Sequence, residues 1–232
     1  MAAGPGCEYA GPGTKRKQVN LTKGRLKGLA PMIFGLSIFD IVFIVVFVTG
    51  ICIRAPYDRA NNLADKRETR FDAREKAGLL LAVSGAILLP AIYLFTPLLN
   101  FADYSVNPFV GTTGAVLSGP AMWAFWRSHK DLGRQYSPKL EVKQSHQLIT
   151  EGIYKHVRHP MYTAVLLNSI CQLCLIGNWI AGPAYLVGFS VLYWCRIDRE
   201  EAMMLDQFGE SYRDYMTKTN RWFPKVRWVR AR

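Results

Sequence analysis

The chain has 232 residues, of which half are hydrophobic and 20% are charged, and its 29 Lys and Arg exceed its 17 Asp and Glu. The apolar residues are concentrated in four long stretches, about 100 residues in all, whose single charged residue is Asp40. Apolar stretches of about 18 residues or more are typical of bilayer-spanning helices. This pattern excludes a soluble globular enzyme, a disordered chain and a disulfide scaffold as first interpretations. It predicts an all-α, polytopic membrane protein.

The apolar stretches predict five spanning helices. The last stretch, 160–195, would reach roughly 54 Å as one straight helix, whereas the hydrocarbon core is about 30 Å thick. Gly177-Asn178, in its middle, is a typical turn pair. We therefore predict a tight hairpin. The five predicted spans are residues 31–53, 77–100, 110–127, 161–176 and 179–197.

The predicted spans divide the chain into three regions. Residues 1–30 form a basic N-terminal tail, residues 31–127 a three-helix membrane region, and residues 128–232 a C-terminal core that contains the hairpin. No cleavable signal peptide is expected, because the first 30 residues are polar and the apolar run that follows is too long for one.

The basic residues of the loops predict an orientation. The loops 101–109 and 177–178 contain no Lys or Arg, whereas 54–76, 127–159 and 196–232 each contain seven or more. Five spans place these three basic segments on one face, and the positive-inside rule makes that face cytoplasmic. The basic N-terminal tail would then lie on the other side, against the rule, but the basic loops outnumber it.

The net charge of +12 does not by itself indicate a nucleic-acid partner. No helix-turn-helix, zinc-finger or RNA-recognition pattern accompanies it. We interpret the excess as juxtamembrane Lys and Arg that face anionic lipid, and we expect membrane lipids rather than nucleic acid as partners.

All four histidines fall within one predicted polar loop, residues 127–159: His129, His146, His156 and His159. A metal site is one interpretation, with His156 and His159 on one helical face, but a supporting set of acidic ligands is missing, and we expect none. The other interpretation is a loop that closes over a ligand at the membrane surface.

A second polar cluster lies where the last predicted span leaves the bilayer. Arg196 and Glu200 are four residues apart, so a helix places them on one face. As an exposed pair they would contribute only about 0.3–0.5 kcal/mol. At this position, a partly desolvated Arg196 can hold a substrate carboxylate bidentately. Farther along, the aromatic residues of 208–223 predict an interfacial helix that lies against lipid headgroups.

These segments together resemble the isoprenylcysteine carboxyl methyltransferase family, whose relatives include the membrane phospholipid methyltransferases. The resemblance covers roughly residues 125–225 and departs from the commonest Gly-Pro-Tyr form at Ile153. The matching residues are His146-Gln147-Leu148-Ile149-Thr150, Gly152-Ile153-Tyr154, Val157-Arg158-His159-Pro160-Met161-Tyr162, Arg196, Glu200-Glu201, Phe208-Gly209 and Tyr212.

The resemblance implies an S-adenosylmethionine-dependent methyltransferase in the membrane. Its cofactor pocket would be built from the loop before the last hairpin and the C-terminal helix, and would face the cytoplasm. Arg196 and Glu200 would act on the substrate side, with a lipophilic acceptor such as an isoprenylcysteine carboxylate. The cofactor contacts implied are His146, Gln147, Leu148, Ile149, Tyr154, His159, Pro160, Met161 and Tyr162.

Three alternatives remain. The acceptor can be a phospholipid amine or a small thiol, which would require Glu200 or a histidine as a base. An NADPH-dependent sterol-type reductase carries a similar Arg-His-Pro-x-Tyr segment, although such enzymes are usually longer. A non-enzymatic scaffold or transporter would find its best support in Asp40, because charges within a membrane are often functional; Asp40 can equally face a neighbouring helix.

Overall fold

The computed structural model describes residues 36–62, 73–136 and 147–225. Within these ranges the regular elements are all helical, as the sequence predicts, with two isolated β-bridges. The α-helices are α1 (Ile38–Asn62), α2 (Ala73–Val83), α3 (Leu89–Phe95), α4 (Pro108–Leu132), α5 (Pro160–Leu175), α6 (Ala181–Phe208) and α7 (Glu210–Lys218).

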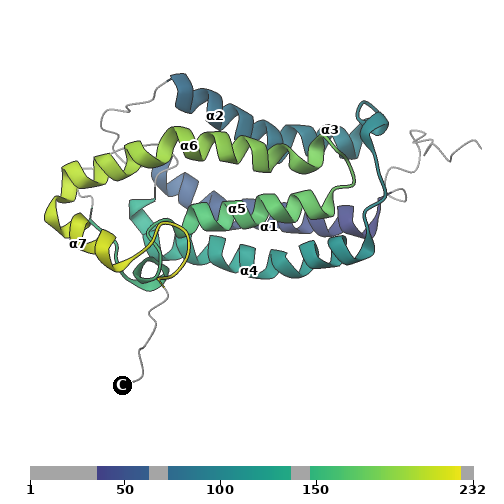
Figure 1. The fold of residues 1–232 in the computed structure, drawn as a ribbon. Coiled ribbons are helices and arrows are strands. Elements are labelled where there is room, and N and C mark those ends of the chain that lie inside the picture. Colours follow the sequence, from purple (N-terminus) through teal and green to yellow (C-terminus); the bar gives the residue numbers. More distant parts are fainter. Residues whose placement is uncertain (1–35, 63–72, 137–146, 226–232) are drawn as a thin grey trace, which may run out of the picture.

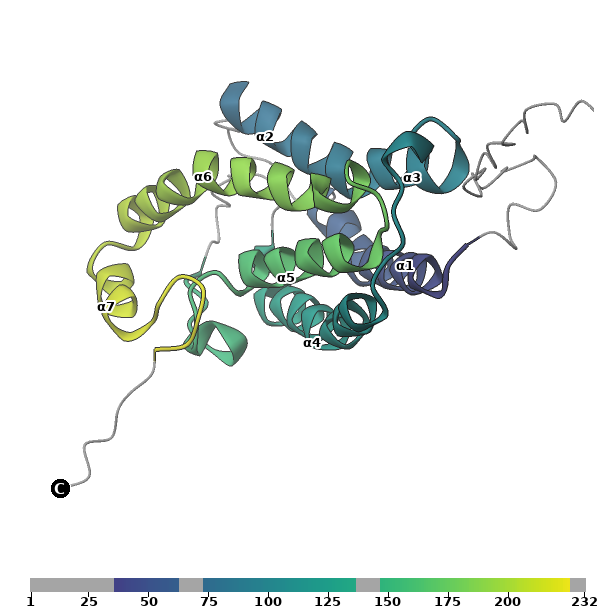
Figure 2. The same cartoon turned by 45° about the vertical axis from the view of Figure 1, so that its right-hand side comes forward.

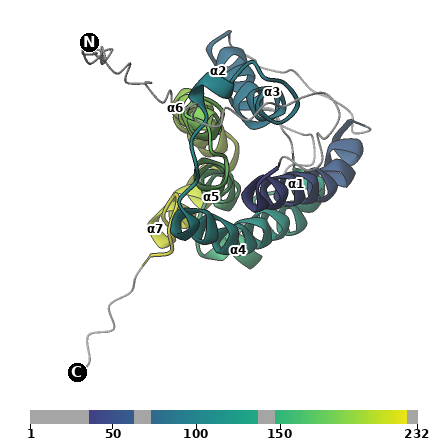
Figure 3. The same ribbon diagram turned by 90° about the vertical axis from the view of Figure 1, so that its right-hand side faces the viewer.

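The long helices form a bundle around the pair α5 and α6 (Figure 1). Helix α4 packs against α5, α2 packs against α6, and α1 packs against α4 and α5. In the view along the bundle, α1 and α2 lie on separate sides (Figure 3). The helices therefore form an incomplete ring, in which α1 and α2 face each other without packing closely.

The predicted hairpin at Gly177-Asn178 is confirmed by the turn between α5 and α6. The buried Asn178 fixes this turn: its Oδ1 accepts hydrogen bonds from the backbone of Ile180 and Ala181, at 3.0 and 2.9 Å. Its Nδ2 donates to the carbonyl oxygen of Leu99, at 2.8 Å. Because Leu99 lies between α3 and α4, this single side chain ties two connecting segments together. Both segments lie at the same end of the bundle (Figure 2).

The first predicted span is displaced: 31–53 was expected, whereas α1 runs from Ile38 to Asn62. Ser37 precedes the helix, and its backbone nitrogen donates a hydrogen bond to Oδ2 of Asp40, at 2.8 Å. The helix continues past its apolar part because Arg54 and Asp58 pair across one turn, at 2.9 Å. The first residues of the predicted span, 31–35, lie outside the described part of the chain.

The second predicted span, 77–100, is one continuous path of three helical segments: α2, a π-helical turn at Ser84–Leu88, and α3. Pro90 follows the π turn, and a proline removes a backbone donor and displaces the carbonyl one turn earlier. Gln172 of α5 compensates, since its Nε2 donates to the carbonyl oxygen of Gly85, at 2.9 Å. The path ends at Phe95 rather than residue 100, just before Pro97.

Asp40 has a structural partner. It is 1% exposed, and its Oδ1 accepts a hydrogen bond from the hydroxyl of Tyr93, at 3.0 Å. The bond joins α1 to α3 on the inside of the bundle. The interpretation in which Asp40 faces a helix neighbour therefore agrees with the structure.

Large apolar side chains cover much of the outer surface of the bundle. They stand exposed on α1, α2, α4 and α6, among them Val45, Leu80, Val116 and Val187. Exposed apolar surface of this extent is characteristic of contact with lipid rather than water. By length and composition, two described segments, Ile38–Ala60 and Ala73–Phe95, are long and apolar enough to cross a membrane, and Pro160–Leu175 is a shorter apolar helix.

Candidate functional site

A cavity of about 670 Å³ lies inside the incomplete ring. Its wall is apolar toward the end of the bundle that holds the α5–α6 turn, and polar toward the end that holds α7. The apolar wall includes Phe43, Phe47, Ile51, Leu79, Val83, Ile87 and Leu175, and the polar wall includes Arg54, Asp58, Tyr136, Arg158, His159, Arg196 and Glu200. The cavity can therefore hold a ligand that has an apolar tail and a polar head.

The residues predicted from the family motifs meet around this one cavity. It is lined by Gln147, Leu148, Ile149, Tyr154, His159, Pro160, Met161, Tyr162, Arg196 and Glu200. The remaining predicted contact, His146, lies outside the described residues. The segment 147–159 and the outgoing end of α6 therefore face each other at the polar end of the bundle.

The C-terminal segment after α7 holds His159 in place. The backbone nitrogens of Arg158 and His159 donate to the carbonyl oxygens of Asn220 and Arg221, at 2.8 and 3.1 Å. Pro160 then begins α5, where a missing backbone donor is tolerated. The position of the predicted cofactor segment thus depends on residues about 60 positions later in the chain.

Arg196 is held between two carboxylates. Its Nε lies 3.5 Å from Oε2 of Glu200 and 3.7 Å from Oε1 of Glu75. The hydroxyl of Tyr162 donates to Glu200 Oε2, at 2.6 Å. This arrangement fixes both the predicted substrate-side residues and joins them to the first turn of α5.

Glu75 was not predicted as a site residue. It belongs to α2, is fully buried, and also approaches Arg199, at 4.0 Å. Glu75 lies in a charged stretch of the sequence, and such a stretch predicts a solvent-exposed loop instead of a binding site. Only the packing of α2 on α6 brings it beside Arg196.

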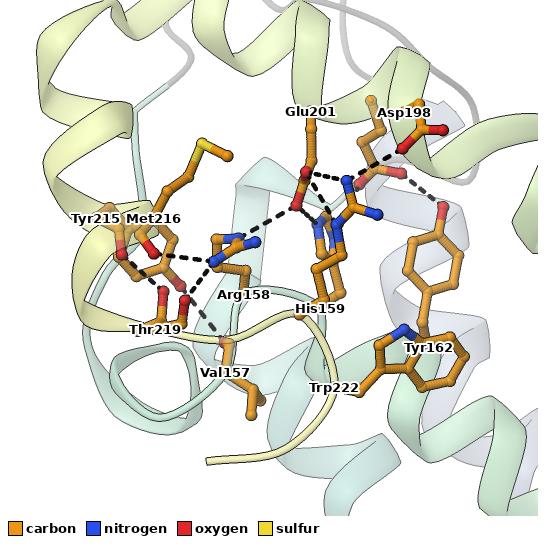
Figure 4. A network of polar contacts seen from close by, with 12 residues as sticks. Val157, Arg158, His159, Tyr162, Asp198, Glu201, Tyr215, Met216, Thr219 and Trp222 are labelled. Atoms are coloured by element: carbon orange, nitrogen blue, oxygen red, sulfur yellow. Dashed lines mark hydrogen bonds and ion pairs between the residues drawn. The ribbon is translucent and has the colours of Figure 1, made fainter. Parts of the chain in front are cut away.

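Glu201 is the centre of a buried ionic network (Figure 4). Its carboxylate accepts from Arg158 and His159, each at 3.2 Å, and from Arg221, at 2.6 Å. Burial alone would raise the pKa of Glu201, but the hydrogen bonds from His159 and Arg221 and the charge of Arg158 hold this pKa at about 2. The carboxylate is therefore ionised and joins the motif loop, α6 and the C-terminal segment.

The predicted polar loop begins later than expected, because α4 continues to Leu132. His129 lies in its last turn, 1% exposed, and its Nδ1 donates to the carbonyl oxygen of Phe125, at 2.8 Å. The ring packs against Tyr57 and Tyr136 instead of lining the cavity. His156 is exposed. Among the described histidines, His159 alone lines the cavity.

The aromatic side chains of helix α7 were expected to lie against lipid headgroups, and the structure places them differently. Tyr212 and Tyr215 are buried, and both line the cavity. The hydroxyl of Tyr215 donates to the carbonyl oxygen of Tyr154, at 2.6 Å. Gly209, with a φ of +52°, turns the chain between α6 and α7 and directs these tyrosines inward. They close the site instead of facing lipid.

Comparison with known proteins supports the motif assignment. Residues 115–206 match the model of the isoprenylcysteine carboxyl methyltransferase family. The chain is similar to protein-S-isoprenylcysteine O-methyltransferases from three organisms. The identity is 28% over 127 residues for Dictyostelium discoideum (53% of this chain, 50% of the relative), 32% over 96 for Schizosaccharomyces pombe (40% and 41%), and 34% over 94 for Xenopus laevis (39% and 31%).

A solved structure has a similar fold. It is described as that of the eukaryotic intramembrane Ras methyltransferase of this family without a monobody, and the TM-score is 0.53 with 19% identity. The alignment covers 84% of this chain and 70% of the other, so the fold likeness extends well beyond residues 115–206.

The matches to the curated relatives span half or less of those proteins' own length. The family-model match, residues 115–206, contains the motif loop, the hairpin and the polar end of α6. The resemblance predicted from the motifs is therefore confirmed: over residues 115–206 the chain matches the isoprenylcysteine carboxyl methyltransferase family.

Proposed function

We propose that the protein is an integral membrane methyltransferase that uses S-adenosylmethionine and acts on a lipophilic acceptor, in the first place the carboxylate of an isoprenylcysteine. The observation that carries this proposal is one cavity that joins the family motif residues to an apolar part between α1 and α2. This part, the apolar arm, is lined by Phe43, Phe47, Gly50, Ile51, Leu79, Val83 and Ile87. A methyl acceptor with a long apolar tail needs both parts.

The residues at the polar end suit S-adenosylmethionine. Aliphatic and aromatic side chains, such as Leu148, Tyr154 and Met161, offer walls for a flat adenine. Polar groups, among them Gln147 and His159, are available for the charged methionine end. When bound, this cofactor would supply an electrophilic methyl group. The proposal assigns the predicted cofactor contacts, His146 included, to this role.

The proposed chemistry is displacement by a positioned carboxylate. A carboxylate is already a nucleophile at neutral pH, so no general base is required. Arg196 would aim it, with the guanidinium itself held by Glu200 and Glu75. Tyr212 and Tyr215 of α7 cover the site and help to exclude water. Positioning and dehydration of this kind contribute several kcal/mol to catalysis.

The proposed topology has five crossings: α1, the α2–α3 path, α4, α5 and α6. The exposed apolar residues on α4 and α6 support crossings beyond the two segments that meet both length and composition criteria. The polar end of the cavity lies at the end of the bundle where the basic segments begin. By the positive-inside rule we place this end at the cytoplasm.

An amine acceptor is the second candidate function. Two carboxylates, Glu75 and Glu200, flank Arg196. Such a pair can accept a proton from an ammonium group, which must lose one before it attacks a methyl donor. The choice of acceptor is therefore the first property to measure.

Labelled S-adenosylmethionine and purified protein in liposomes test the proposal. The acceptor panel is S-farnesylcysteine, phosphatidylethanolamine and an alkanethiol. We expect label on the farnesylcysteine as a base-labile methyl ester, and S-adenosylmethionine should raise the melting temperature of the protein. Label on phosphatidylethanolamine alone would favour the second candidate. A rise in melting temperature with NADPH, and none with S-adenosylmethionine, would reject both.

A further inference from the structure

Besides Arg196 and Arg158, which is paired with Glu201, the polar wall of the cavity contains Arg54, on α1. Arg54 and Asp58 both line the cavity, one turn apart, and the Arg54 Nε donates to Asp58 Oδ2, at 2.9 Å. The hydroxyl of Tyr136, which follows α4, donates to the other carboxylate oxygen, at 3.1 Å. Asp58 thus holds the guanidinium by its Nε and leaves the terminal nitrogens out of this bond.

The charge around Arg196 makes this further cation important. Arg196 and Arg199 carry two positive charges, and the carboxylates beside them, Glu75 and Glu200, carry two negative charges, so the group has a formal net charge of zero. A carboxylate that approached Arg196 alone would also meet these two carboxylates. Like charges at this separation repel each other, more strongly where water is excluded. Because Glu75 and Glu200 already neutralise Arg196 and Arg199, a further guanidinium in the wall would strengthen the binding of an acceptor carboxylate.

Arg54 lines the same cavity as Arg196. Arg54 belongs to α1 and Arg196 to α6, which lie on different sides of the ring (Figure 3). Tyr136 lines the cavity too, and its hydroxyl is sensitive to both guanidinium groups: burial raises its pKa, and the charges of Arg54 and Arg196 act in the opposite direction. A head group at the polar end would lie between the two arginines.

We infer that Arg54 is a specificity-determining residue, which binds the anionic carboxylate of the acceptor from the α1 side and selects it over neutral and cationic head groups. This inference rests on the proposed function. Helix α1 lies outside residues 115–206, so the role does not follow from the family match. It follows from the position of Arg54 and from the carboxylates beside Arg196.

The test compares Arg54→Gln with Arg59→Gln. Arg59 is an exposed arginine on the same helix and does not line the cavity. The ligands are N-acetyl-S-farnesylcysteine, which carries the carboxylate, and its carboxamide, used as an uncharged competitor. Loss of one charge-assisted hydrogen bond corresponds to about 10- to 100-fold in affinity.

We expect Arg54→Gln to raise KM for the carboxylate acceptor by about tenfold or more, with the inhibition constant of the carboxamide within about twofold of the wild-type value. Arg54→Lys should recover part of the loss, and Arg59→Gln should leave both constants unchanged. Melting temperatures of the variants report whether each remains folded.

The outcomes separate the inference from the proposed function. If the wild type transfers no methyl group to any carboxylate acceptor, the proposed carboxyl methylation fails and the inference fails with it. If the wild type is active and Arg54→Gln changes neither constant, or weakens both ligands equally, the proposed function stands and the role of Arg54 is overturned.

Discussion

At the scale of single residues, the ionic partners of the motif residues explain why the site keeps its shape. Glu201 is 4% exposed and accepts hydrogen bonds from Arg158 and His159 of the motif loop and from Arg221 of the C-terminal segment. Removing one partner of a buried ion pair leaves an uncompensated charge, which costs more than the pair contributes. Glu201 is therefore expected to hold the site together without touching the acceptor.

Replacement of Glu201 by Gln should lower the free energy of unfolding by about 3 kcal/mol. It leaves the guanidinium groups of Arg158 and Arg221 without their shared carboxylate. Chemical denaturation in detergent measures the effect, and Glu210→Gln, at an exposed pair on α7, is the matched control. A Glu201→Gln protein as stable as the control variant would contradict this role.

The same residue predicts a pH dependence. The folded pKa of about 2 is below the ordinary value of 4.5, so the contribution of Glu201 to stability is complete above pH 5. It is lost as the pH falls from about 4.5 through 2, because the carboxylate must be protonated there. Unfolding followed between pH 6 and pH 3 should show a steeper loss for the wild type than for Glu201→Gln, and parallel curves would refute the assignment.

The sequence predicted some of the residues of the site and missed others. The motif contained Arg196, Glu200 and Glu201, and their spacing on a helix was sufficient to pair the first two. Glu75 and Arg54 gave no such signal, because each lies among other charged residues at the end of an apolar stretch. Their contribution depends on which helix packs beside α6, and this information is absent from local spacing.

At the scale of elements, the apolar stretches located the helices but not their ends. Helix α4 extends to Leu132 beyond the predicted end at residue 127, and α6 extends to Phe208 beyond residue 197. Arg127 and Asp131 pair at 2.9 Å across the added turn of α4. A hydropathy criterion detects the part of a helix suited to lipid, whereas the hydrogen-bonded helix continues into water wherever side chains stabilise it.

The contact between α2 and α6 depends on glycine. A Cβ at Gly188 would lie 2.5 Å from the carbonyl oxygen of Leu81, and one at Gly85 would lie 2.4 Å from that of Ala184. Real Cβ atoms essentially never approach backbone this closely, so larger residues would force the helices apart. This close packing places Glu75 beside Arg196. Small residues at helix interfaces in membranes generally allow two backbones to approach in this way.

Gly188→Ala should therefore destabilise the protein by about 2 kcal/mol, through overpacking against the α2 backbone. The matched control is Gly119→Ala on α4, where a Cβ would meet nothing within 4 Å. That substitution should stabilise the helix by about 0.5–1 kcal/mol, through helix propensity. Melting temperatures in one detergent compare the two variants, and a stable Gly188→Ala protein would show that α2 and α6 are not in close contact.

At the scale of the whole molecule, the amphipathic cavity connects the fold to the proposed reaction. The all-helical fold, the hairpin and the meeting of the motif loop with α6 could all be predicted from the sequence. The apolar arm could not, because it arises from the failure of α1 and α2 to pack together. In the sequence, the apolar residues of α1 and α2 that line the cavity cannot be distinguished from the apolar residues of any spanning helix.

Filling the apolar arm should affect the acceptor alone. Gly50 lines this arm, and a Cβ there would meet only the flexible side chain of Met122, at 4.0 Å. Gly50→Phe should therefore fold, raise KM for S-farnesylcysteine by about tenfold or more, and leave the affinity for S-adenosylmethionine within about twofold. Methyl-transfer kinetics and calorimetry measure the two quantities, and an unchanged KM would show that the tail binds elsewhere.

The most direct test of the account is an experimental structure with S-adenosylhomocysteine and S-farnesylcysteine bound together. We expect the nucleoside beside residues 147–162, the carboxylate between Arg54 and Arg196, and the farnesyl chain in the apolar arm between α1 and α2. Density for the two ligands in separate cavities, or at opposite ends of the bundle, would contradict a shared site for donor and acceptor.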